Sequence, residues 1–426
     1  MHQPEPLILI LGTVISGFSL ITALRMLYRK RLIDDTPTLK TIGVFIGQAE
    51  LKGTAESNHP LESHLTGTRC VQYRWSIHEK WSKQVTETYT DSDGKTRTRT
   101  KTRSGWKTID HGSDSIRFYL KDETGVIRID PENAEITGKK VLNTTVGRNH
   151  PLYYHKAPRH SVSNSDHRRK FTETLIPLHE EIYILGQTRM RNDAIAVEVA
   201  YDSEEPLYII STKPEKQVSK TYGRRYLIYL GLGLAPAILL PQLLTPSLTF
   251  IQLLTSVTLY LTAATLGWTW IIYNSLVTLQ NNVDEAWSLI DIQLKRRSNL
   301  IPNLVEIVEG IQKHETKIHQ ELARLRSQKH LDPENKQAQG VTQTLYKITE
   351  KYPELVSGEH FLSLQQSLEE TEQRIALARD YYNEMTNFYN TRLDTVPDKY
   401  VAKLARLEPR KLLQAENFKR APLEMT

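Results

Sequence analysis

The hydrophobic and polar positions of this chain form three successive patterns. Residues 30–222 contain short apolar runs separated by turn residues, as in TIGVFIG and IRFYLKDETGVIRID, which predicts a β-rich domain. No charged residue occurs between Tyr226 and Val283, and a stretch of that length is typical of membrane segments. Residues 274–426 carry apolar residues at helical spacing, which predicts an all-α helical bundle.

The apolar stretches predict three transmembrane helices. The first covers residues 7–28; basic residues follow it and none precedes it, which favours a retained anchor over a cleaved signal peptide. The charge-free stretch divides at an uncharged turn into residues 226–244 and 248–273. A re-entrant hairpin that does not cross the membrane is the alternative for these two. We expect the third helix to continue directly into the bundle.

The predicted bundle begins with a heptad stripe, the pattern of a helix that packs along other helices. This seam consists of Val283, Trp287, Ile290, Leu294, Arg297, Ile301, Leu304 and Val308. A second stripe runs from Leu364 to Tyr389. The seam forms either the core of the bundle or an interface for a partner or a second copy. Because a lone buried charge is unfavourable, we expect Arg297 to pair with a carboxylate or to lie at the edge. Gln293 is expected to be exposed.

Two parts of the chain resemble known families. The runs NNVDEAWSLIDIQLKRRSNLIPNLVE and FLSLQQSLEETEQRIALARDYYNEMTNFYN resemble the LemA family. This resemblance implies a membrane helix followed by an antiparallel helical bundle, and no established chemistry. The runs HPLESHLTGTRCVQYRWSI and SIRFYLKDETGVIRIDPENAEI are similar to the GIDE-type domain of a mitochondrial membrane E3 ubiquitin ligase and of bacterial proteins. The chain therefore resembles a GIDE-type domain fused to a LemA family domain.

Catalytic and cofactor-binding patterns are missing from the sequence. The chain has one cysteine, Cys70, whereas the zinc of a RING domain needs several Cys and His ligands, so the ligase resemblance carries no catalytic RING. Cys70 follows an apolar strand pattern, which favours a buried and inert thiol. The spacing of the histidines between His150 and His167 matches no metal site, and the DSDG segment lacks the carboxylates of a calcium loop. We expect no enzyme activity, no cofactor, no metal, no small-molecule substrate and no nucleic acid.

One strand carries an unusual density of basic residues. Lys95, Arg97, Arg99, Lys101 and Arg103 alternate with threonines, so they share one face of a strand. If Asp93-Gly94 forms the turn, their cross-strand partners are mainly serine and threonine, and the basic face has no compensating carboxylates. This face either attracts anionic lipid headgroups or is simply solvated.

These patterns favour a non-catalytic membrane scaffold, assembly or regulatory protein of the LemA type. The alternatives are a GIDE-type, ubiquitin-ligase-like protein without a RING, and an anionic-lipid-binding protein of the membrane surface. We expect a multi-pass integral protein of a bacterial inner membrane, with its soluble domains in the cytoplasm. The expected partners are membrane lipids, and a protein or a second copy bound through the helical bundle.

Overall fold

The computed structural model describes residues 6–90, 96–191, 193, 196–204, 207–244, 250–311 and 359–413. The chain divides into two compact units. Thr38–Val218 forms the first, here called the β unit. Met1–Pro37 and Ser219–Thr426 form the second, here called the helical unit. Each unit has its own elements and its own packing.

The first sheet of the β unit closes on itself. Its order is β1 (Thr38–Leu39), β2 (Gly47–Glu56), β6 (Phe118–Lys121), β7 (Val126–Ile129), β12 (Val197–Ala200), β11 (Glu181–Met190), β13 (Ile209–Ser211) and β8 (Glu135–Thr137). Because β2 also pairs with β11, the strands from β2 to β11 form a small barrel. Buried side chains such as Leu51, Ile129 and Ile184 fill it. Position 53 requires glycine, since a Cβ there would lie 2.4 Å from the carbonyl oxygen of Lys121.

A short turn next to this barrel is organised by one carboxylate. The 3₁₀ helix η1 (Thr41–Gly43) donates to Asp122 through both the amide and the hydroxyl of Thr41, at 2.8 and 2.6 Å. Thr124 adds its own amide and hydroxyl, each at 2.7 Å. Burial alone would raise the pKa of Asp122, but these hydrogen bonds outweigh it and lower that pKa from 3.8 to about 2.

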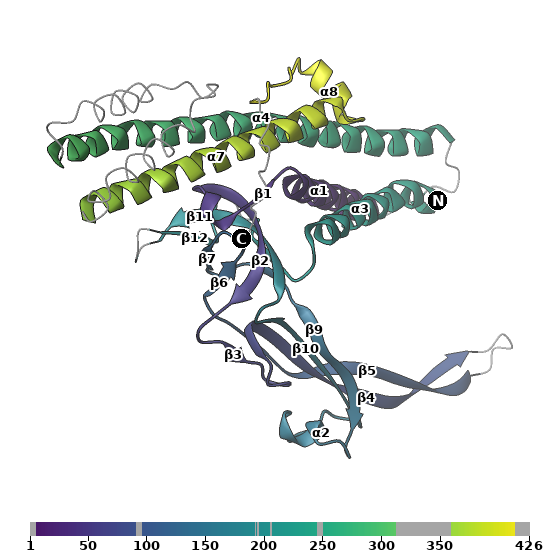
Figure 1. Cartoon of the computed structure of the whole chain (residues 1–426). Coiled ribbons are helices and arrows are strands. Elements are labelled where there is room, and N and C mark those ends of the chain that lie inside the picture. Colours follow the sequence, from purple (N-terminus) through teal and green to yellow (C-terminus); the bar gives the residue numbers. More distant parts are fainter. Residues whose placement is uncertain are drawn as a thin grey trace, which may run out of the picture. The chain divides into compact units, whose positions relative to one another are not determined.

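The second sheet of the β unit has one covered face and one polar face. It contains β3 (Leu61–Glu62), β4 (Arg69–Thr90), β5 (Thr96–Ser115), β9 (Lys139–Gly147) and β10 (Ser165–Pro177) (Figure 1). Ile77 and Phe171 are buried on the covered face, together with Tyr153 of the short helix α2 (Leu152–His155). Beyond Trp81, β4 pairs only with β5 among the described strands, so the two continue as a two-stranded ribbon.

The helical unit is built around two long helices. It contains α1 (Pro6–Asp34), most of α3 (Glu215–Leu244), α4 (Phe250–Ile311), α7 (Glu359–Asp394) and α8 (Asp398–Leu404). Trp287 of α4 packs edge-on against Tyr382 of α7, and Arg297 lies against Glu372, so the helices α4 and α7 are antiparallel (Figure 1). The 62 residues of α4 form one helix, so residues 250–273 run without a break into the seam, as expected of the third apolar stretch.

The prediction of three transmembrane helices is wrong. Within the described ranges, one helix, Leu11–Asp34, is long and apolar enough to cross a membrane, and its place near the N-terminus also suits a signal sequence. It overlaps the predicted span 7–28, whereas no second helix of this kind is found among the described residues of 226–244 and 248–273. Part of the charge-free stretch instead packs within the helical unit, where Ile272 and Leu276 are fully buried. A lack of charge therefore overestimated the number of crossings.

The predicted all-α bundle over residues 274–426 also needs correction. Its described part is smaller: α7 packs on α4, and the short helix α8 follows. The first helix of the pair begins at Phe250, well before residue 274. The shorter helix expected near residues 341–351 lies outside the described residues.

Candidate functional site: an ionic junction in the helical unit

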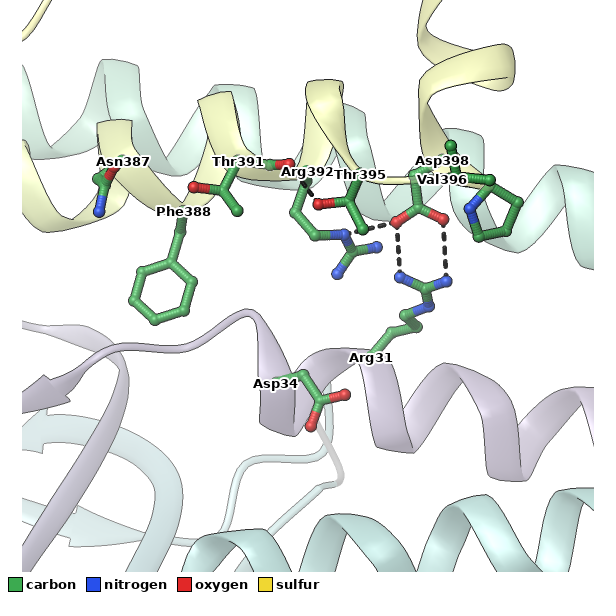
Figure 2. Close-up of a pocket in the computed structure, with 10 residues that line it drawn as sticks. Arg31, Asp34, Asn387, Phe388, Thr391, Arg392, Thr395, Val396 and Asp398 are labelled. Carbon is green, nitrogen blue, oxygen red and sulfur yellow. Dashed lines mark hydrogen bonds and ion pairs between the residues drawn. The ribbon is translucent and has the colours of Figure 1, made fainter.

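The C-terminal end of α1 is joined to α8 by a buried ion pair. Arg31 donates two hydrogen bonds to the two carboxylate oxygens of Asp398, at 2.8 and 3.0 Å (Figure 2). Asp398 is the first residue of α8, and only 2% of its side chain is exposed. Arg392 of α7 donates to the same carboxylate from Nε at 2.6 Å. One carboxylate therefore links three helices, and bidentate pairs of this kind also fix orientation.

A second carboxylate extends this junction to α4. Asp35, directly after α1, accepts hydrogen bonds from Arg392 and, at 2.5 Å, from the hydroxyl of Ser275 in α4. Burial is the largest influence on Asp35 and raises its pKa above 3.8, while Arg392 offsets part of the rise. The neighbouring Asp34 accepts from Lys30, and from Ser219 of α3 at 2.5 Å.

A cavity of about 440 Å³ opens beside these groups. Arg31 and Asp34 line it from α1, Phe388 and Arg392 from the end of α7, and residues 395–398 from the link to the start of α8 (Figure 2). The guanidinium groups face carboxylates, so their charges largely cancel at the cavity wall. Such a site can hold helices in a fixed arrangement, but it presents no unopposed charge to attract an ionic substrate. We call Arg31, Asp35, Ser275, Arg392 and Asp398 the junction.

The junction was not predicted from the sequence. Arg31 and Asp398 are 367 positions apart, so no local pattern connects them. One available signal was Asp398 itself, an acidic residue directly after a proline at a helix start, where a carboxylate is favoured. The other was the cluster of charges that ends the apolar stretch of α1.

The structure places the predicted seam residues on more than one side of α4. Val283, Ile290, Arg297 and Ile301 are buried, whereas Trp287 is 38% exposed and Leu294 is half-buried. The side chains of Leu304 and Val308 lie outside the described ones. The intervening buried positions are Ala286 and Gln293, so the expectation that Gln293 is exposed is wrong. A heptad stripe of large apolar residues includes Trp287 and Leu294, which are the neighbours of the buried Ala286 and Gln293.

Of the two alternatives predicted for Arg297, the structure shows pairing with a carboxylate. The Nη1 atom of Arg297 lies 3.2 Å from Oε1 of Glu372, and the side chain of this arginine is 1% exposed. Burial is the main cause that raises the pKa of Glu372, and Arg297 partly offsets it. The pair therefore lies in a desolvated contact between α4 and α7.

The basic strand has a different register from the predicted one. Lys95 and the Asp93-Gly94 turn lie outside the described residues, and Arg97, Arg99, Lys101 and Arg103 are exposed on β5. They lie opposite Tyr89, Glu87, Val85 and Lys83 in turn. The carboxylate of Glu87 contacts Lys101 at 2.8 Å and Arg103 at 2.7 Å. The prediction of an uncompensated face is therefore wrong, although the cations still outnumber Glu87.

The one cysteine sits in a setting that disfavours reaction. Cys70 is fully buried, and its thiol faces the carbonyl oxygen of Leu61 at 3.7 Å. Burial raises the pKa of this thiol from 9.0 to about 11, so the nucleophilic thiolate is scarce at neutral pH. Across the described part of the chain, no group of three or more His, Cys, Asp and Glu side chains is arranged to hold a metal ion.

Comparisons with known families agree with the two resemblances predicted from the sequence. Residues 86–240 match the GIDE family model, described as E3 Ubiquitin ligase, and residues 286–425 match the LemA family model. A search of curated proteins finds no match to this chain. The first segment extends from β4 to α3, and the second includes the paired part of α4 with α7 and α8. The two matches suggest a membrane-associated or ubiquitin-ligase-like protein without specifying an activity. The chain therefore joins a segment that matches the GIDE family model to a segment that matches the LemA family model.

Proposed function

We propose that this protein is a non-catalytic membrane scaffold, which holds the LemA-type helix pair at the end of a membrane anchor for assembly or regulation of other components. The junction is the observation that supports this proposal. Asp398 and Asp35 connect the end of α1 to α7 and α8 through the guanidinium groups of Arg31 and Arg392, and to α4 through the hydroxyl of Ser275. A rigid attachment of this kind suits a protein that positions partners.

The anchor and its orientation form part of the proposal. We assign the membrane span to α1, whose apolar part is followed by Arg29, Lys30 and Arg31. Basic residues remain on the cytoplasmic side of a span, so the helices that follow the junction lie in the cytoplasm. The partner is a second copy of the chain or another protein.

In-cell photo-crosslinking tests the scaffold proposal. A photoreactive residue replaces the exposed Asp291 on α4 or Gln366 on α7, and mass spectrometry identifies the products. We expect discrete crosslinks to one protein or to a second copy. Asp398→Asn should weaken them, because it loosens the junction, whereas Asp394→Asn should not, because Asp394 is 86% exposed and outside the junction. A crosslinking pattern at background level from both positions would refute the scaffold proposal.

The ubiquitin-ligase-like alternative takes a specific form. The chain has one cysteine, and that residue is buried with a raised thiol pKa, so a RING zinc site is not expected. A ligase-related role would then consist of recruiting a modifying enzyme. A crosslink from Asp291 to such an enzyme would favour this alternative over assembly of membrane components.

A second candidate function is binding of an anionic membrane surface by the ribbon of β4 and β5. Its basic face carries Arg97, Arg99, Lys101 and Arg103, and each basic residue near such a surface contributes about 1 kcal/mol. The full chain, reconstituted in neutral vesicles, should tether vesicles that contain phosphatidylserine. Replacing these four residues by Gln should abolish the tethering. Replacing Thr96, Thr98, Thr100 and Thr102 on the opposite face by Gln provides the matched control, and equal effects of both sets would contradict this function.

A further inference from the structure

The polar face of the second sheet carries a groove whose charges are not balanced. The groove has a volume of about 640 Å³ and lies across β5, β4, β10 and β9. Directly opposed residues share a face, so the registers of these strands define rows across the sheet. The first row is Ser113, Arg74, Thr174 and Lys140. Arg74 and Lys140 are both exposed and both line the groove.

The second row adds donors without adding negative charge. It consists of His111, Ser76, Thr172 and Asn143. The hydroxyls of Ser76 and Thr172 lie 2.7 Å apart, in a hydrogen bond that joins β4 to β10 across the groove floor. His111 is exposed at the β5 side of the groove.

The third row continues the same composition with Thr108, His78, Lys170 and Thr145. Both ring nitrogens of His78 contact hydroxyls: Nδ1 contacts Thr108 at 3.0 Å and Nε2 contacts Ser76 at 3.1 Å. Burial first, and the charge of Lys170 second, lower the pKa of His78. His78 is therefore uncharged at neutral pH, and the positive charges of the three rows belong to Arg74, Lys140 and Lys170.

The carboxylates of β5 beside the groove lie on the other face of that strand, while Asp166 of β10 pairs with Lys80 at 3.3 Å, beyond the third row. Asp110 and Asp114 of β5 lie opposite Ile77 and Tyr73, not opposite the groove residues. Protein surfaces normally intersperse both signs of charge, so three rows with Arg74, Lys170 and Lys140 but without a carboxylate are unusual. Arg supplies a planar fork and Lys a point charge, and hydroxyls supply further donors, which together suit a tetrahedral oxyanion.

We propose that this groove binds a phosphomonoester or diphosphate group, held by Arg74 and Lys140 and by hydroxyl donors of the floor. The volume exceeds that of one phosphate, so the ligand is a phosphorylated small molecule or the headgroup of a phospholipid with a terminal phosphate. Both present the same dianionic group. The proposal concerns the β unit and is independent of the scaffold proposal.

Binding of inorganic pyrophosphate to the full chain in phosphate-free detergent micelles tests the proposal. Line broadening in ³¹P NMR, at constant ionic strength, gives the dissociation constant. Loss of one charge-assisted hydrogen bond should weaken binding about tenfold, so Arg74→Gln and Lys140→Gln should each have this effect. Arg74→Lys should retain part of the affinity.

Lys139→Gln is the matched control, because Lys139 precedes Lys140 on β9 but is held by Glu180 at 2.9 Å. It should leave pyrophosphate binding unchanged, and circular dichroism confirms that each variant is folded. Equal weakening by Lys139→Gln and Lys140→Gln, or unchanged binding in Arg74→Gln, would overturn the proposal. Phosphatidic acid added to the micelles distinguishes the two sources: it displaces pyrophosphate if the ligand is a lipid headgroup and does not if the ligand is soluble.

Discussion

Replacing Asp398 by Asn is the most direct perturbation of the junction. The substitution keeps the size of the side chain and removes the charge that Arg31 and Arg392 share. Asp398 accepts three hydrogen bonds from these two guanidinium groups, and its side chain is 2% exposed. Arg392 keeps its contact with Asp35, whereas both of the contacts from Arg31 to Asp398 are weakened.

The structure sets the expected magnitude. Removing one partner of a buried ion pair costs about 3–5 kcal/mol, because the other charge stays desolvated. Arg31 and Arg392 retain 17% and 13% exposure of their side chains, so water reaches them in part. We therefore expect the lower end of this range, about 3 kcal/mol, which corresponds to an opening equilibrium of α8 about a hundredfold larger.

Hydrogen exchange measured by mass spectrometry is the appropriate assay, since it reports local opening of α8 and of the end of α7. Asp394→Asn is the control: Asp394 is 86% exposed, and its contact with Lys399 is 3.8 Å long, so it should change exchange less than about twofold. The double variant Arg31→Gln with Asp398→Asn should open less than the sum of the single effects predicts. If Asp398→Asn and Asp394→Asn accelerate exchange equally, the junction does not hold α8 in place.

Three further perturbations test other parts of the structure, each by thermal unfolding of the full chain followed by circular dichroism. Asp122→Asn should lower stability by about 1 kcal/mol at neutral pH, after allowance for solvent screening. Because the folded-state pKa of Asp122 is depressed from 3.8 to about 2, its stabilisation is present above the first value and is lost as the pH falls to the second. A difference from the wild type that persists below this window would contradict the assignment. Glu372→Gln should cost about 3 kcal/mol, because Arg297 is 1% exposed, whereas Arg297→Met with Glu372→Met should recover most of that loss. A double variant less stable than Glu372→Gln would show that the charged pair itself stabilises the helix contact. Gly53→Ala should cost about 1–3 kcal/mol by overpacking, and Gly147→Ala, where a Cβ meets no atom within 4 Å, should be nearly neutral; similar losses in both would refute the close approach at Gly53.

Alternating and helical patterns predicted the nature of the main elements but not their exact registers. Val283 and Ile290 of the predicted seam are buried. Between them, the seam was predicted to continue through Trp287, but this residue is exposed. Ala286 is fully buried, whereas the ring of Trp287 stays 38% exposed and packs edge-on against Tyr382 of α7. Which of two adjacent positions is buried depends on how closely the helices approach each other. Sequence spacing alone does not contain that distance.

The ribbon shows the same limit in a strand. A two-residue turn at Asp93-Gly94 would place Thr88 opposite Arg99, whereas the structure places Glu87 there. A shift of one residue moves every partner to the other face, so the predicted lack of carboxylates depended entirely on the turn length. The junction could not be predicted by either kind of pattern, because its members come from three separate parts of the chain, residues 31–35, 275 and 392–398.

Two polar contacts explain how α4 and α7 are held in one register. An apolar seam tolerates sliding by a heptad, but sliding would separate Arg297 from Glu372, and an unpaired buried charge costs about 3–5 kcal/mol. Ser275 lies about 33 Å before Arg297 along α4, and Arg392 lies about 30 Å beyond Glu372 along α7, at a rise of about 1.5 Å per residue. These nearly equal lengths let Asp35 contact Ser275 and Arg392 together while the other pair stays formed. The pairing of Arg297 with Glu372 therefore also sets where Arg392 meets the end of α1, which couples the register of the LemA-type helices to their attachment.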